Sequence, residues 1–499
     1  MGGWIAALVL VVPMLAAGAT TLAHGAPRLQ TRLSLAGSYG LLAVSAALMA
    51  EVWAGGMVVV RAGNWAAPFG ITLAVDTFGA VMTLIAAITG AACLTFALGE
   101  IEERHRRAWL HPLSHVLLLG VCGAFLTGDL FNLYVWFEVM LIASFGLMTI
   151  GGTKAQTDGA VKYVALNLVA TLLFLLAVGL LYGLTGTLNY ADLARSVPEV
   201  ANTGVLTAAA TLLMAAFGMK AAVFPLFFWL PAAYHTPLVS VSAVFAGLLT
   251  KVGVYALIRA FTLLFTHDVA WTHGILLWVS GLTMLTGVLG AAAQAEMRRI
   301  LSWHIISQIG YMVMGLGLYT PLAIVGSVFY LVHHIVVKAN LFLIAGVAAR
   351  LTGSMELKRI GGLYRAAPLL GVLFFVPAFS LAGFPPLSGF WAKLVLVRAA
   401  LEERSWWIAA AALVTGLLTI YSMTKIWGEA FWKPHPGGDS AARPLSAAPA
   451  SMLGPIVALA ACTVVIGLFA QPFWVVAERA ANELLDPSSY IAAVLGGGG

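Results

Sequence analysis

The sequence predicts an all-α membrane protein that crosses the bilayer many times. Of its 499 residues, 61% are hydrophobic and only 9% are charged, and the mean hydropathy is +0.96. Apolar runs longer than about 18 residues, which identify membrane-spanning helices, recur along nearly the whole chain. At roughly 20 residues per crossing, these runs predict about fourteen transmembrane helices.

Short polar segments separate the predicted spans, and none of them would hold an extramembranous domain. The N-terminal apolar run lacks the positively charged start of a secretory signal, so we interpret it as the first span. The expected spans are 2–24, 33–60, 71–98, 112–128, 130–151, 160–185, 204–234, 237–265, 271–294, 300–318, 321–349, 366–398, 405–432 and 451–474.

The distribution of basic residues between the loops predicts the orientation. With the N-terminus outside, the inner loops contain Arg28, Arg32, Arg104, Arg106, Arg107, Lys154, Lys162, Arg298, Arg299, Arg350, Lys358, Arg359, Arg365, Lys433 and Arg443. The outer loops then contain only Arg61, Arg195, Arg398, Arg404 and Arg479. Because positive loops stay inside, both termini are expected outside. The net charge of +6 therefore reflects topology and does not indicate nucleic-acid binding.

The three cysteines lie in apolar stretches at unrelated spacings. Such spacing indicates neither a metal site nor a disulfide framework, so we expect the three cysteines to be small buried residues.

Two proline-containing segments that lie five predicted spans apart resemble each other: FPLFFWLP at 224–231 and FPPLSGFW at 384–391. Proline removes a backbone donor and clashes with the preceding helical turn. We therefore expect helix breaks at Pro225, Pro231, Pro377, Pro385 and Pro386. Interrupted helices at corresponding positions of two halves are typical of inverted-repeat transporters. Ordinary proline kinks, which membrane helices tolerate, are the alternative.

Seven ionisable residues lie within the predicted spans: Glu138, Lys220, Lys251, His333, His334, Lys338 and Lys393. Unpaired, the five charged ones would cost about 12–17 kcal/mol. That exceeds the roughly 5–15 kcal/mol of net stability of a domain, so they must be paired, hydrated or neutral. Snorkelling is an alternative for Lys393, near a span end, and hydrogen-bonded core histidines are an alternative for His333 and His334. For His304, near the inner boundary, the core interpretation is favoured.

The residue types suit proton transfer. Burial disfavours the charged form of lysine, while a carboxylate nearby favours it. A lysine beside Glu138 is therefore held charged and becomes a better donor when the carboxylate moves away. Histidine titrates near neutral pH and suits a relay between lysines. The carboxylates at span ends, such as Asp76 and Asp129, are interpreted as capping groups.

Six segments carry a family resemblance: GDLFNLYVWFEVMLIAS, MKAAVFPLFFWLP, LLTKVGVYALIR, SQIGYM, HHIVVKANLFLIAG and GFPPLSGFWAK. In this order they resemble the antiporter-like subunits of respiratory complex I and of Mrp antiporters, and most of all the D-subunit family of Mrp-type Na⁺/H⁺ antiporters. The resemblance covers about residues 70–430.

This resemblance implies two inverted five-helix repeats, at 112–265 and 271–432, with broken seventh and twelfth helices. Residues 1–98 would form three preceding helices, and 451–499 the last helix and a tail. It implies an ion pair between Glu138 and Lys220 and a central Lys251. His333, His334 and Lys338 would form a relay that ends at Lys393.

The implied function is a proton-translocating subunit of a multisubunit Na⁺/H⁺ antiporter in the bacterial cell membrane, not an enzyme. Its expected partners resemble the Mrp A, B, C, E, F and G subunits; no cofactor or bound metal is expected. A pumping subunit of complex I or of a membrane-bound hydrogenase is the alternative. A solute carrier would need a midplane cavity instead of a charged row, and a scaffold leaves the buried charges unexplained. Hard cations prefer oxygen ligands, and no aspartate lies mid-span, so Na⁺ is expected to cross elsewhere.

Overall fold

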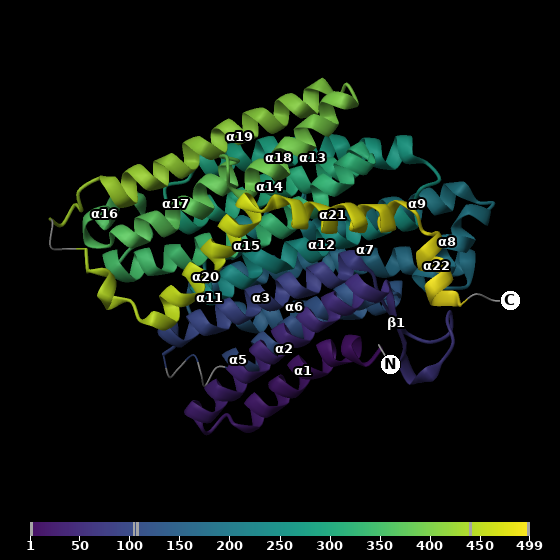
Figure 1. Cartoon of the computed structure of the whole chain (residues 1–499), viewed down its shortest axis with the longest axis horizontal. Helices are drawn as coiled ribbons and strands as arrows, with labels where there is room; N and C mark the ends of the chain where they lie inside the picture. Colours follow the sequence, from purple (N-terminus) through teal and green to yellow (C-terminus); the bar gives the residue numbers. More distant parts are fainter. Residues whose placement is uncertain (1–2, 103–104, 106–108, 439–441, 497–499) are drawn as a thin grey trace.

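Long apolar helices run side by side along the long axis of the molecule (Figure 1). This computed structural model describes residues 3–102, 105, 109–438 and 442–496, so Arg104, Arg106 and Arg107 lie outside the described residues. The longer helices are α1 (Gly3–Leu22), α2 (Pro27–Gly55), α3 (Thr77–Glu100), α5 (Leu110–Leu126), α6 (Leu130–Thr149), α7 (Lys154–Thr185), α9 (Thr203–Ala221), α12 (Thr250–Leu263), α13 (Val269–Ala293), α14 (Met297–Leu318), α15 (Pro321–Thr352), α17 (Pro368–Ala382), α18 (Ser388–Glu402), α19 (Trp406–Ile426), α20 (Ala450–Leu468) and α21 (Ala470–Leu485).

Shorter elements connect or extend these helices. The short α-helices are α8 (Tyr190–Ser196), α10 (Trp229–Ala233), α11 (Val239–Val244), α16 (Leu363–Ala366) and α22 (Ser488–Leu495). Two π-helical segments are η3 (Phe245–Leu249) and η5 (Trp427–Trp432). The 3₁₀ turns are η1 (Ala62–Asn64), η2 (Val197–Glu199), η4 (Leu357–Arg359) and η6 (Leu445–Ala447).

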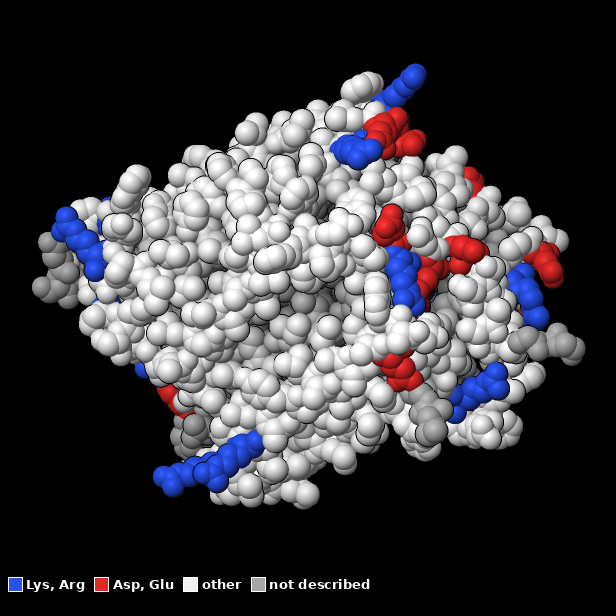
Figure 2. Space-filling model, viewed as in Figure 1, with Lys and Arg blue, Asp and Glu red and all other residues white. Residues whose placement is uncertain are grey.

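The predicted class of polytopic all-α membrane protein is confirmed. In the described part of the chain, twelve helices are long and apolar enough to cross a membrane, and α5 and α17 are shorter apolar helices. Figure 2 shows acidic and basic residues mainly toward the two ends of the visible face, with a wide uncharged band between them. Such a band suits the hydrocarbon core of a bilayer. The number of fourteen crossings and the two repeats stay predictions.

Two helices are interrupted near the proline segments. Helix α9 ends before Pro225 and α10 begins after it, while Pro385 and Pro386 separate α17 from α18. The expected break at Pro377 is wrong, because α17 continues through this residue to Ala382. Proline costs a helix one backbone bond, which neighbouring helices in a bundle can offset. Pro231 does not break α10 either; it lies in the first turn, where the backbone N–H has no intrahelical acceptor.

The last predicted span, 451–474, consists of two helices, α20 and α21. Helix α20 reaches the α17–α18 break, where Gly467 packs so closely that a Cβ there would clash with the Pro386 carbonyl oxygen. Helix α21 then continues to the end of the bundle that carries the termini. There the Glu483 carboxylate accepts hydrogen bonds from Thr77 N and Oγ1, both at 2.8 Å. The amphipathic sequence of α21, with charged residues inside an apolar helix, concealed this continuation.

Strands β1 (Val58–Arg61) and β2 (Thr72–Val75) form a small antiparallel sheet that the spans 33–60 and 71–98 did not anticipate. The sheet lies beside both chain ends (Figure 1), and Arg61 donates a hydrogen bond to the Val494 carbonyl at 3.4 Å. Both termini therefore lie at one end of the bundle, which we call the termini end.

The orientation can be measured with single cysteines. Lys358→Cys and Ala201→Cys place exposed thiols in the loops at opposite ends of the bundle. With the termini outside, we expect an impermeant maleimide to label position 358 only from the cytoplasmic side and position 201 only from outside. The parent protein controls for Cys462, which is partly buried. Labelling with the reverse sidedness would invert the topology.

Candidate functional site

A hydroxyl group joins the predicted carboxylate and lysine of the first half. Thr171 Oγ1 on α7 donates to Glu138 Oε1 on α6 at 2.6 Å, and Lys220 Nζ on α9 donates to Thr171 Oγ1 at 3.3 Å. The Phe137 ring centroid lies 5.4 Å from Lys220 Nζ. Instead of the expected direct pair, the structure contains a three-residue unit. Thr171 could not be identified from its own stretch of sequence, because its partners come from other helices.

The break in α9 places Lys220 in the last helical turn. The helix ends at Ala221, and Ala222 adopts a left-handed conformation with φ of 63°. The unpaired carbonyls at a helix C-terminus favour a positive charge. A Cβ at Gly253 on α12 would lie 2.5 Å from the Ala221 amide nitrogen, so the helix that carries Lys251 packs directly on this turn.

Lys251 lies in the fully buried helix α12, directly after the π-helical segment η3. Its Nζ donates to the Ala246 carbonyl within η3. Single π-helical turns are rare and occur frequently at functional sites. Segment η3 packs on α15 beside His334, because a Cβ at Gly247 would lie 3.6 Å from the Ile335 carbonyl oxygen.

His334 lies at the centre of the buried charges. Its side chain is 0% exposed, and neither ring nitrogen has a hydrogen-bond partner among the described residues. It interacts electrostatically with Lys251, Lys338 and Lys393. Lys338, one helical turn along α15, donates to the Leu301 carbonyl of α14 at 2.9 Å. A histidine with free ring nitrogens among lysines can accept and release a proton.

His333 points instead to the second helix break. Its Nδ1 lies 2.7 Å from Ser388 Oγ, and Ser388 Oγ lies 2.9 Å from Ser380 Oγ. Ser380 is on α17 and Ser388 begins α18, so the two hydroxyls link both halves of the broken helix to α15. Neither serine was singled out from the sequence, although Ser388 lies in the GFPPLSGFWAK segment.

Lys393 is buried, 8% exposed, and does not snorkel to an interface. Its Nζ donates to the carbonyl of Ala382, the last residue of α17, at 3.2 Å, and lies 4.8 Å from the Tyr311 ring centroid. At both helix breaks a lysine thus lies beside the C-terminal end of the first half, Lys220 within α9 itself and Lys393 reaching the end of α17 from α18. The helix dipole favours a cation there.

His304 belongs with these residues, against the expectation of a purely structural histidine. It is 0% exposed, and it interacts electrostatically with Lys338 and Lys393. Its Nδ1 lies 3.4 Å from Ser307 Oγ, and its Nε2 has no partner among the described residues. A sequence signal existed: His304, Ser307 and Tyr311 recur at the three- and four-residue spacing that places side chains on one helix face.

The carboxylates at span ends act as caps, as expected for Asp76 and Asp129. Asp76 accepts from the Gly79 amide at 2.9 Å and Asp129 from the Asn132 amide at 2.7 Å. Asp76 also forms a buried ion pair with Arg259 at 2.6 and 2.8 Å, which the sequence did not indicate. This pairing fully occupies the Asp76 carboxylate.

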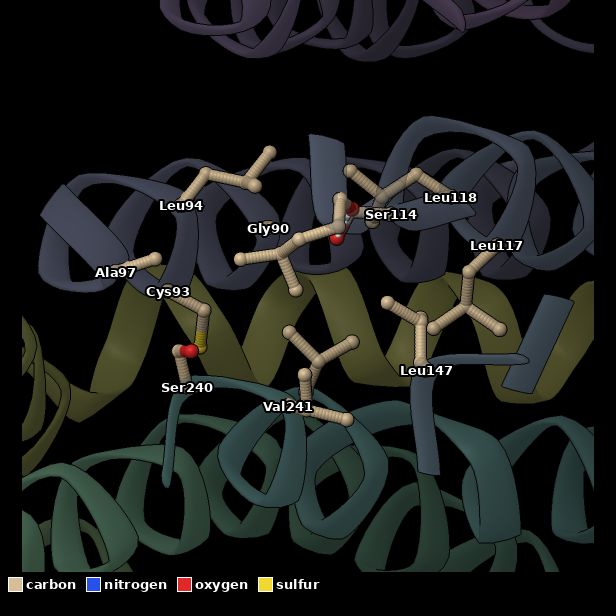
Figure 3. Close-up of a pocket in the computed structure, with 12 residues that line it drawn as sticks. Gly90, Cys93, Leu94, Ala97, Ser114, Leu117, Leu118, Leu147, Ser240 and Val241 are labelled. Carbon is tan, nitrogen blue, oxygen red and sulfur yellow. Dashed lines mark hydrogen bonds between the residues drawn. The ribbon is translucent and has the colours of Figure 1, made fainter. Parts of the chain in front are cut away.

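Two apolar cavities away from the charged row do not resemble a solute-binding site. The cavity in Figure 3 has a volume of about 20 Å³, and mainly aliphatic side chains of α3, α5 and α11 line it. A cavity of about 420 Å³ lies between α2, α3, α15, α20 and α21, and every residue that lines it is apolar. A solute site combines apolar walls with a few placed polar groups.

Two polar cavities, of about 480 and 450 Å³, meet at the end opposite the termini, and both are lined by His235, Gln294 and Arg299. Burial, together with the nearby Arg299 and Arg298, lowers the pKa of His235 to about 4. Helix α10, the second half of the first broken helix, lines the smaller cavity. Among the described residues, no group of three or more His, Cys, Asp or Glu side chains is arranged to hold a metal ion.

Comparison with known proteins identifies relatives among antiporter subunits. The family described as NADH:quinone oxidoreductase/Mrp antiporter, TM, matches residues 127–419. The chain is 49% identical to the D subunit of the Na⁺/H⁺ antiporter of Alkalihalophilus pseudofirmus, over 91% of this chain and 92% of that protein. It is 40% identical to the protein of the same description from Bacillus subtilis, with the same coverage of both chains.

Two solved structures have closely similar folds. A chain of the Mrp complex from Dietzia sp. DQ12-45-1b is 34% identical, with a TM-score of 0.91 and 99% of both chains covered. A chain of the membrane-bound sulfane sulfur reductase, an archaeal respiratory membrane complex, is 26% identical, with a TM-score of 0.92 and 98% of this chain and 100% of that chain covered.

Proposed function

Because this chain belongs to the NADH:quinone oxidoreductase/Mrp antiporter transmembrane family, we propose that it is the proton-translocating subunit of a multisubunit Na⁺/H⁺ antiporter. Relatives named as the D subunits of Na⁺/H⁺ antiporters, at 49% and 40% identity over most of both chains, support this function. The protein resides in the bacterial cell membrane with both termini outside.

The observation that carries the proposal is the buried row itself. It extends from Glu138 through Lys220 and Lys251 to His334, and then through Lys338 to the lysine at the second break. Cations at such depth are costly and mark ion pathways. At the centre of the row is His334, whose two ring nitrogens have no hydrogen-bond partner among the described residues. A histidine between two lysines can accept a proton from one and release it to the other.

Electrostatic coupling between neighbouring charged residues of the row drives the transfer of protons along it. A proton that leaves Lys220 lowers the repulsion on the next cation, so the neighbouring groups change protonation in sequence. His334 accepts a proton from one lysine and passes it to another. His304 and the His333–Ser388–Ser380 chain extend the row to Lys393 and to the second helix break.

Sodium crosses in a partner protein of the assembly. Na⁺ is a hard cation that prefers several oxygen ligands. Glu138 is occupied by Thr171, and Asp76 by Arg259. The partners are chains like the Mrp A, B, C, E, F and G subunits, and this chain itself uses no cofactor.

A proton-pumping subunit of a respiratory complex is the second candidate, because the chain from the sulfane sulfur reductase has an equally similar fold. The higher sequence identity to the antiporter subunits favours exchange over redox-driven pumping: 34% in the Mrp complex against 26% in the reductase.

Reconstitution tests the proposed function. The native assembly, purified through a tag on this chain and placed in proteoliposomes, is expected to exchange Na⁺ for H⁺, whereas this chain alone should not. A pH-sensitive dye reports exchange, and mass spectrometry identifies the accompanying chains. Full exchange by the isolated chain, or redox subunits in the native assembly, would contradict the proposal.

A further inference from the structure

We propose that the Thr171 hydroxyl carries the proton between Lys220 and Glu138, a role that rests on the proposed function. The donor and acceptor pattern is complete: the Lys220 ammonium donates to Thr171 Oγ1 at 3.3 Å, and the Thr171 hydroxyl donates to Glu138 Oε1 at 2.6 Å. Each proton already lies on the line to its next acceptor.

Thr171 departs from the usual behaviour of a threonine inside a helix. Several buried threonines inside helices of this bundle donate to the carbonyl four residues earlier, as Thr89 does to Ile85 at 2.8 Å and Thr463 does to Leu459 at 3.0 Å. Such local bonds satisfy a hydroxyl that is buried in an apolar environment. Thr171 instead directs its proton to the carboxylate of another helix. Packing alone does not require this orientation.

The transfer balances without any further reactant. One Nζ–H bond of Lys220 breaks as that proton joins Thr171 Oγ1, while the original Oγ1–H bond breaks and its proton joins Glu138 Oε1. Lys220 becomes a neutral amine, Glu138 a neutral acid, and Thr171 is again a hydroxyl. The two opposite charges disappear together, so the net charge of the unit is unchanged. The reverse transfer restores the ion pair.

The surroundings favour transfer through the hydroxyl over transfer through bulk water. Thr171 is 6% exposed and Lys220 is 7% exposed. The Phe137 ring lies 5.4 Å from Lys220 Nζ and lines the unit on the α6 side. In such a site a fixed hydroxyl bridge substitutes for an ordered water molecule.

Three substitutions at one position separate a relay from a packing role. Thr171→Ser keeps the hydroxyl, and we expect near-parental antiport. Thr171→Val replaces the hydroxyl with a methyl group and excludes water, so antiport should fall about 100-fold, as for loss of a proton-transfer group. Thr171→Ala leaves space for one water molecule between two polar partners, and water should restore part of the rate. The relay therefore predicts the order Ser, Ala, Val.

A packing role predicts a different order. Loss of buried volume makes alanine more damaging than valine, which nearly conserves the size of threonine. The assay is Na⁺-driven proton movement in everted vesicles, with equal amounts of assembled complex on native gels. Thr463→Val is the matched control, because Thr463 is buried but its hydroxyl donates to the Leu459 carbonyl of its own helix; it should run at the parental rate.

Two variants of the flanking residues distinguish this inference from the proposed function. If Glu138→Gln and Lys220→Met are inactive but Thr171→Val is as active as the parent, the relay is wrong and the proposed function stands. Antiport that is lower in Thr171→Ala than in Thr171→Val also overturns the relay. Parental activity in Glu138→Gln and Lys220→Met would overturn both.

Discussion

Glu138→Gln and Lys220→Met are each expected to reduce antiport to the background of vesicles without the complex. Each substitution keeps the approximate side-chain shape and removes one charged end of the Glu138–Thr171–Lys220 unit. Without the carboxylate the unit cannot store a proton, and without the amine it cannot supply one. Glu138→Gln also leaves the buried Lys220 charge without its carboxylate, which costs about 3–5 kcal/mol. The measurement is dye-monitored antiport in everted vesicles.

This experiment needs one control for assembly of the complex and one for loss of a charged residue outside the Glu138–Thr171–Lys220 unit. Native gels show whether each variant still enters the complex. Glu429→Gln is the matched control, because Glu429 pairs with Lys433 at 2.7 Å in a more exposed setting near the end of α19–η5. Exposed pairs of this kind contribute about 0–1 kcal/mol, so activity should persist. If a correctly assembled Glu138→Gln or Lys220→Met variant keeps the parental rate, the unit is not part of the transport path.

Lys251→Arg is expected to inactivate antiport nearly as fully as Lys251→Met. Lys251 is 0% exposed, and within the described part of the chain its ammonium donates only to the backbone carbonyl of Ala246. Arginine keeps the positive charge but stays protonated in proteins, whereas a buried lysine can release its proton. If transport requires this release in each cycle, retaining the charge does not rescue activity. The measurement is antiport across a pH series in assembled complex.

The same substitution elsewhere provides the control for side-chain size. Lys425 donates to the carbonyls of Ala292 and Gln294 at 3.0 and 2.6 Å, away from the row. Lys425→Arg should therefore support normal antiport. A Lys251→Arg variant that runs near the parental rate would show that Lys251 acts as a fixed charge. Proton release would then be assigned to the histidines.

The sequence determined the class of fold and the place of each deep charge along the chain. Apolar run length is a local property, and bilayer thickness converts it directly into spans. Residues such as Lys251 and Lys338 were identified by the same argument, since a charge inside an apolar run is unfavourable wherever the helix lies. The breaks beside Pro225 and Pro385 also followed from local backbone chemistry.

Partners across helices were decided only by the tertiary structure. Thr171 and Ser388 are ordinary small polar residues in apolar segments, and nothing in their own stretch says which charged group they contact. His304 joined the row because α14 packs against α15 and α18. Arg259 forms its buried ion pair with Asp76, a residue far earlier in the chain. Pro377 failed as a break because one missing hydrogen bond is tolerated where neighbouring helices support the backbone. A hydrogen bond depends on distance in space, and the packing of the helices sets that distance.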